Sequence, residues 1–104
     1  MAKAEIMAGI CGFHAAVEAR MDGEMVNLSI QSDCRAIQKL AAELTQVNPY
    51  QEMSARRTVP ATLQAGMKFC THAACPVPVG IIKAVEVEAG LALPQDAVIK
   101  VSKE

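Results

Sequence analysis

The chain has 104 residues, of which 52% are hydrophobic, enough to build one compact domain without disulfide staples. Ten basic and eleven acidic residues give a net charge of -1, and aromatic residues are 3% of the chain, so the electrostatic field and stacking surfaces of nucleic-acid-binding proteins are absent. No apolar run is long enough to span a bilayer and no export signal is recognised at the start, so we expect a cytoplasmic protein that binds neither membrane nor nucleic acid.

The first part of the chain predicts a β-hairpin preceded by a short strand. Apolar and polar residues alternate from Phe13 to Arg20 and again over residues 26–31, which is the period of a half-buried strand. Asp22-Gly23 lies between the two runs and predicts a tight turn. Residues 4–8 form a possible third strand ahead of the hairpin.

A helix is predicted from about Asp33 to Gln46, because Ser32 and Asp33 suit an N-cap and apolar residues follow at three-and-four spacing. Asn48-Pro49 ends it. The stretch from Tyr50 to Lys68 has no clear period and leaves open a short helix around residues 51–56 or 61–67.

A second main helix is predicted to open near Cys75-Pro76, because proline is favoured in a first helical turn, and to end at Gly90. Residues 97–102 alternate again and predict a last strand. The expected fold is a single α+β domain over residues 1–104, with a small antiparallel or mixed sheet, made of the hairpin plus edge strands, and two main helices packed on one face.

The four cysteines fall at joints between these elements. Cys11 lies between two extended segments, Cys34 in the first turn of one helix, Cys70 after the irregular stretch and Cys75 at the start of the next helix. Helix N-termini carry partial positive charge, which stabilises a thiolate or an anionic cluster. We therefore predict that Cys11, Cys34, Cys70 and Cys75 form one site for zinc or an iron-sulfur cluster.

Two other interpretations of the cysteines stay open. Cys70 and Cys75 are separated by four residues and are candidates for a thiol-redox pair, although the usual spacing is shorter. Alternatively, the cysteines are small apolar residues in the core of an interaction domain. No catalytic set of serine, histidine and aspartate is suggested, so a non-enzymatic protein is expected.

Two histidines accompany the cysteines, His14 after Cys11 and His72 between Cys70 and Cys75. Either is able to replace a cysteine ligand or to donate a hydrogen bond to one. A solvated or capping histidine is the plainer interpretation of each, and His14 is expected on the strand face opposite Phe13.

The order of these features resembles the TSCPD-type domain, on the strength of Cys11-Gly12-Phe13-His14, the hairpin turn at Asp22-Gly23, Ser32-Asp33-Cys34 and Cys75-Pro76. A looser similarity extends to scaffold proteins of iron-sulfur cluster assembly. The chain also resembles a small uncharacterised family from anaerobic bacteria and archaea, in the segment that runs from Cys75 to Pro94. These resemblances imply a four-thiolate site, with a protein partner or a homodimer as the possible assembly.

Overall fold

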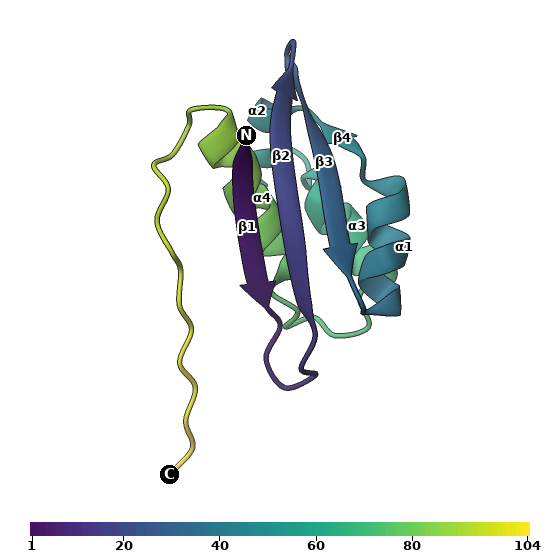
Figure 1. Ribbon diagram of the computed structural model, residues 1–104, viewed down its shortest axis with the longest axis vertical. Coiled ribbons are helices and arrows are strands. Elements are labelled where there is room, and N and C mark those ends of the chain that lie inside the picture. The colour runs from purple at the N-terminus through teal and green to yellow at the C-terminus, as the bar shows by residue number, and fades with distance from the viewer.

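The computed structural model describes residues 1–104 as a sheet with helices packed on one of its faces (Figure 1). This arrangement confirms the predicted α+β class. The elements in chain order are β1 (Ala2–Met7), β2 (His14–Asp22), β3 (Met25–Ser32), α1 (Arg35–Glu43), β4 (Gln46–Val47), α2 (Pro49–Glu52), α3 (Ala61–Phe69) and α4 (Val77–Glu88).

The sheet has the order β1-β2-β3-β4, and all of its neighbouring strands are antiparallel. The hairpin forms where the sequence predicts it, with Asp22 paired to Met25 and Gly23 at a φ of +64°. A positive φ is favourable for glycine and costly for most other residues, which explains the glycine in this turn. The two outer strands, β1 and β4, are the edges of the sheet.

The core lies between the sheet and the helices, and it is aliphatic. On β2 the residues Ala15, Val17 and Ala19 are buried, while Glu18 between them is exposed. Leu40 of α1 and Ile81 of α4 cover this face from the helical layer and are fully buried. The period-two pattern therefore predicts the buried face of β2 correctly, except that Phe13 precedes the strand and is 42% exposed.

Helix α1 is shorter than the predicted range of Asp33–Gln46. The reason is competition from the sheet, because the Leu28 N–H donates to the Thr45 carbonyl over 2.9 Å and Val47 pairs with Val26. The chain leaves the helix at Leu44 to form β4, whose two residues add to the hairpin.

The irregular stretch contains two helices instead of one. Asn48 begins α2 by accepting a hydrogen bond from the Tyr50 N–H over 3.0 Å. Helix α3 has a weak helical period because its buried face is made of small residues, Thr62, Ala65 and Gly66. A helix that packs through small side chains gives little periodic signal in a sequence.

Two glycines allow α4 to approach its neighbours closely. A Cβ added to Gly66 of α3 would lie 2.7 Å from Cγ of Pro78, and one added to Gly80 would collide with the side chain of Ile6. Helix α4 is thus held against α3 on one side and β1 on the other. This packing places the end of α3 beside the start of α4.

The far end of α4 is fixed by Glu88. Its carboxylate accepts a hydrogen bond from the Met21 N–H over 2.8 Å and lies 3.4 Å from the amino group of Met1. The hydrogen bond from Met21 is the main cause that lowers the pKa of Glu88 from its ordinary value of 4.5.

The predicted last strand is not part of the sheet in the single chain. Residues 97–102 are extended and exposed, and no backbone hydrogen bond joins any residue beyond Leu91 to the rest of the chain. In Figure 1 this segment leaves the end of α4 and runs past β1 to a point well beyond the sheet. The prediction of a strand in this sheet is therefore wrong for the isolated chain, because a strand needs a neighbour to complete its hydrogen bonds.

None of the four helices combines the length and the apolar composition that crossing a bilayer requires.

Candidate functional site

All four cysteines line one pocket. The elements that carry them meet at the end of the molecule where β1 and β3 finish and α1 and α4 begin (Figure 1). The pocket has a volume of about 370 Å³. Eleven of its fifteen lining residues are hydrophobic, and they include Phe13, Ile37 and Val77. The structure therefore brings together, around one apolar cavity, cysteines from three separate parts of the sequence.

Cys34 is held at the N-terminus of α1 by a local hydrogen-bonded turn. Its N–H donates to the Ser32 hydroxyl over 3.1 Å, and that hydroxyl donates to the His14 carbonyl over 2.8 Å. The Cys34 carbonyl accepts the first helical hydrogen bond, from the Gln38 N–H. Ser32 thus fixes Cys34 against the start of β2, a role that goes beyond the helix-capping one predicted from the sequence.

Cys70 and Cys75 enter the pocket from the connection between α3 and α4. Cys70 ends α3, with its N–H donating to the Gly66 carbonyl over 2.9 Å. The Cys75 N–H donates to the His72 carbonyl over 3.2 Å, which closes a turn directly before α4. Because Gly66 lies close to the ring of Pro78, the end of α3 that carries Cys70 lies beside the start of α4 that follows Cys75.

Cys11 lies at the tip of the loop between β1 and β2. The Ala8 N–H donates to the Phe13 carbonyl and the Gly12 N–H donates to the Gly9 carbonyl, so the loop is a narrow turn. Gly9 and Gly12 both have positive φ, at +98° and +75°. Cys11 is exposed, whereas the other three cysteines are partly buried and pack against the core.

Both histidines also line the pocket, and both are exposed. His14 is the first residue of β2, and its neighbour Ala15 faces the core, so His14 lies on the outer strand face as predicted. His72 lies in the turn between Cys70 and Cys75. Their placement at the rim suits a role beside the thiols rather than in the core.

The thiols of the pocket influence one another. Burial, repulsion from Cys75, a hydrogen bond with Cys75 and repulsion from Cys34 raise the pKa of Cys70 from 9.0 to about 11. Burial and two neighbouring cysteines therefore disfavour a negative charge on the Cys70 sulfur. A bound cation reverses this repulsion, because it is attracted to each thiolate.

The thiols are not arranged as a finished metal site. No three of the His, Cys, Asp and Glu side chains lie close enough to hold a metal ion. Side chains of the pocket would have to move inward before they could share one ion, and Cys11 is the one that lies exposed. The donor set fits a thiophilic metal in its chemistry, since thiolate sulfur is the ligand that zinc and iron-sulfur clusters prefer.

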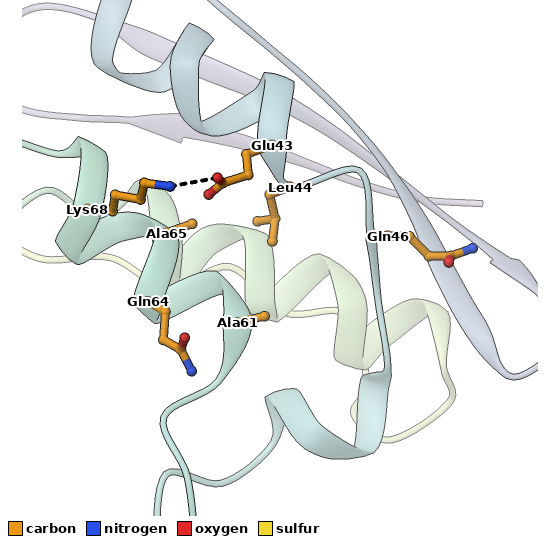
Figure 2. A pocket seen from close by; sticks show the side chains of 7 residues that line it. All are labelled: Glu43, Leu44, Gln46, Ala61, Gln64, Ala65 and Lys68. Atoms are coloured by element: carbon orange, nitrogen blue, oxygen red, sulfur yellow. Dashed lines mark hydrogen bonds and ion pairs between the residues drawn. The ribbon is translucent and has the colours of Figure 1, made fainter.

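A second pocket, of about 400 Å³, lies between α1 and α3 and contains no cysteine or histidine (Figure 2). Lys68 and Glu43 face each other across it, with Nζ of Lys68 2.7 Å from Oε1 of Glu43. The amides of Gln46 and Gln64 donate to Asn27 and to the Val59 carbonyl, respectively. Its charged and amide side chains are thus engaged within the chain.

Glu52 is a buried carboxylate, 3% exposed, whose role the sequence pattern does not predict. It accepts hydrogen bonds from the Ala61 and Thr62 N–H groups, both over 2.9 Å, and from the Thr62 hydroxyl. These are the free N–H groups at the start of α3, so Glu52 acts as the cap of that helix. The start of α3 at Pro60-Ala61 has no capping side chain of its own, which indicates that a residue elsewhere in the chain supplies the cap.

The chain belongs to a family of unknown function, DUF6951, which matches residues 2–101. Comparison with curated proteins gives no match, and comparison with solved structures gives none. The family agrees with the expectation of an uncharacterised protein. The resemblance to the TSCPD-type domain is not tested by this match and stays a prediction.

Proposed function

We propose that the chain is a metal-binding module in which Cys34, Cys70 and Cys75 hold an iron-sulfur cluster and Cys11 closes over it as the fourth ligand. The observation that carries the proposal is that all four cysteines line one pocket. Core cysteines are commonly buried, but none of these four is. Thiols at the edge of a cavity are accessible to a metal in a way that core thiols are not.

The size and the walls of the pocket favour a cluster over a single ion. One water molecule occupies about 30 Å³ of liquid, so a cavity of about 370 Å³ is roomy for one zinc ion. The apolar walls and the N-terminus of α1, which has no side-chain cap and no acidic residue in its first turn, suit an anionic cluster. Zinc in a closed tetrahedral site is the second candidate, and its role would be structural.

A thiol-redox function is the alternative that a specific contact favours, because Cys70 and Cys75 share a hydrogen bond. An attacking thiol in such proteins has a lowered pKa. The pKa of Cys70 is raised to about 11, which is the opposite of what that thiol needs. Two further cysteines line the same pocket, which a redox pair does not need, so the metal-binding proposal is the better supported of the two.

The test is elemental and spectroscopic analysis of protein purified without oxygen and reconstituted with iron and sulfide. We expect iron, acid-labile sulfide and a visible absorption band, all lost in Cys34→Ser and Cys75→Ser. Met67→Ser is a matched control, since it removes an exposed sulfur that lines neither pocket.

Stoichiometric zinc without sulfide would replace the cluster by a structural zinc site. If all four thiols still react with a thiol reagent after the protein is exposed to iron with sulfide and to zinc, the metal-binding proposal is refuted. A disulfide between Cys70 and Cys75, formed and reduced reversibly in protein without metal, would favour the redox alternative.

A further inference from the structure

Residues 97–102 have the pattern of a strand and no partner within the chain. Ile99 and Val101 fall on one side of this alternation and are 80% and 88% exposed. Leu93 precedes Pro94 and is therefore driven out of the helical region, so the chain leaves α4 without continuing the helix. The segment thus presents apolar side chains and free backbone groups to solvent.

The sheet has an unpaired edge at β1 to which a further strand can hydrogen-bond. Strand β1 is an edge, so one row of its N–H and C=O groups has no neighbouring strand. On the face that α4 covers, Gly80 lies against the buried side chain of Ile6 in this edge strand. A strand added at this edge would therefore extend the sheet beside residues that α4 covers.

The side chains of the two segments are complementary in one antiparallel register. When Ile99 lies opposite Ile6, Val101 lies opposite Ala4, and both join the face that is covered by α4. The same register sets Lys100 opposite Glu5 on the outer face, where both strands are exposed. Opposite charges at facing positions of an antiparallel pair are favourable.

We propose that residues 97–102 of one chain add as an antiparallel strand to the open edge of β1 in a second copy of the chain, and that two chains exchange these segments reciprocally. Each chain offers one free segment and one free edge, so a two-fold dimer satisfies both. The segment projects away from its own sheet in Figure 1, as an exchanged segment does. Since it leaves α4 near the start of β1, it would meet its own β1 only in the parallel direction, which is slightly less stable per residue.

The test is sedimentation equilibrium of the whole 104-residue chain at about 100 µM, a concentration that reveals even weak dimers. A reductant and a chelator are present throughout, so that neither a disulfide through Cys11 nor a bridging metal can join two chains. We expect a dimer for the unaltered protein and a monomer for Ile99→Asp. The matched control is Val98→Asp, which places the same charge on the outer face and should leave the dimer in place.

Charge reversal tests the register. Lys100→Glu should weaken the dimer by about tenfold, because two like-charged pairs replace two opposite ones. The double variant Glu5→Lys, Lys100→Glu should restore it. Circular dichroism checks that each variant keeps its secondary structure.

Three results would overturn the proposal. They are a monomer for the unaltered chain, a dimer that survives Ile99→Asp, and equal weakening by Ile99→Asp and Val98→Asp. A monomer whose residues 97–102 are protected from hydrogen exchange would assign the segment to its own β1 instead. Because metal is excluded, all these outcomes are independent of the cysteine site.

Discussion

The N-termini of α3 and α1 differ in whether a side chain caps them. At α3, the carboxylate of Glu52 accepts three hydrogen bonds from Ala61 and Thr62 and is almost fully buried. At α1, the N-cap residue is Cys34, whose side chain makes no capping hydrogen bond and faces a pocket with three other thiols. A polar group that caps a helix within the chain serves stability, whereas a thiol that leaves a helix N-terminus uncapped beside a cavity is available to a ligand.

The first prediction concerns the addition of metal to the cysteine pocket. Metal or cluster loading should raise the free energy of unfolding of the wild type by about 4 kcal/mol when free ligand is a thousandfold above its Kd. Cys34→Ser should lose this gain while its metal-free form unfolds much as the wild type does. Urea denaturation with and without zinc, under reducing conditions, measures both effects, and an equal gain in the variant would contradict the assignment of Cys34 as a ligand.

The second prediction concerns loss of the Glu52 cap at the start of α3. Glu52→Gln should lower the free energy of unfolding by about 2 kcal/mol, because an amide cannot accept from all the donors that the carboxylate serves. Glu43→Gln is the control, since it alters an exposed carboxylate with one ion pair and should cost at most about 1 kcal/mol. Urea denaturation compares them, and equal losses would show that the buried cap has no special weight.

The third prediction concerns the spacing of two helices. Gly66→Ala should cost about 1–2 kcal/mol, because the added Cβ meets the rigid ring of Pro78 at 2.7 Å and outweighs the better helix propensity of alanine. It should also weaken metal binding by moving Cys70 away from Cys75. Ala61→Gly in the same helix is a control that lowers helix propensity without crowding α4, and it should leave the metal affinity unchanged.

The fourth prediction separates the thiols from one another. With its pKa raised to about 11, Cys70 should react with iodoacetamide at pH 8 about tenfold more slowly than a thiol of ordinary pKa. Exposed Cys11 should react first. Mass spectrometry of timed samples gives the order, and early labelling of Cys70 would contradict the repulsion among the pocket thiols.

The smallest effect is expected at Glu88, which lies at the opposite end of α4 from the cysteine pocket. Its pKa is lowered by folding, so its contribution to stability is present above the unfolded value of 4.5 and is lost as pH falls through the folded value. Glu88→Gln should therefore make stability less dependent on pH in the acid range. Thermal unfolding between about pH 2 and pH 6, roughly 2 units either side of an ordinary carboxyl pKa, tests this prediction. Glu86→Gln is the control.

Much of the fold could be predicted because its signals are local. The hairpin has alternating strands and a glycine turn, and α4 is bounded by Pro76 and Gly90, so the sequence contains both its pattern and its punctuation. The cap from Glu52 to Thr62 could not be found in this way, since it spans ten residues and no short motif describes it. The end of α1 was misjudged because pairing of Val47 with Val26 decides it from another part of the chain.

The convergence of the cysteines could be predicted in outline from topology. Antiparallel strands and the helices after them place the end of β3 and the start of α1 near the loop that joins β1 to β2. The hydroxyl of Ser32, which holds Cys34 against His14, was assigned only a helix-capping role, because its acceptor lies on a neighbouring strand. Local sequence thus predicts where a ligand lies more readily than what fixes its orientation.

The loop that carries Cys11 has a consequence for how long a metal would stay. Three of the proposed ligands belong to packed elements, while the fourth lies on a narrow turn between two glycines with positive φ. Swinging that turn outward would free one coordination position without unfolding the domain. Residence time would then depend on the opening rate of a six-residue loop, residues 8–13, so a competing thiol should extract the metal much faster than global unfolding releases it.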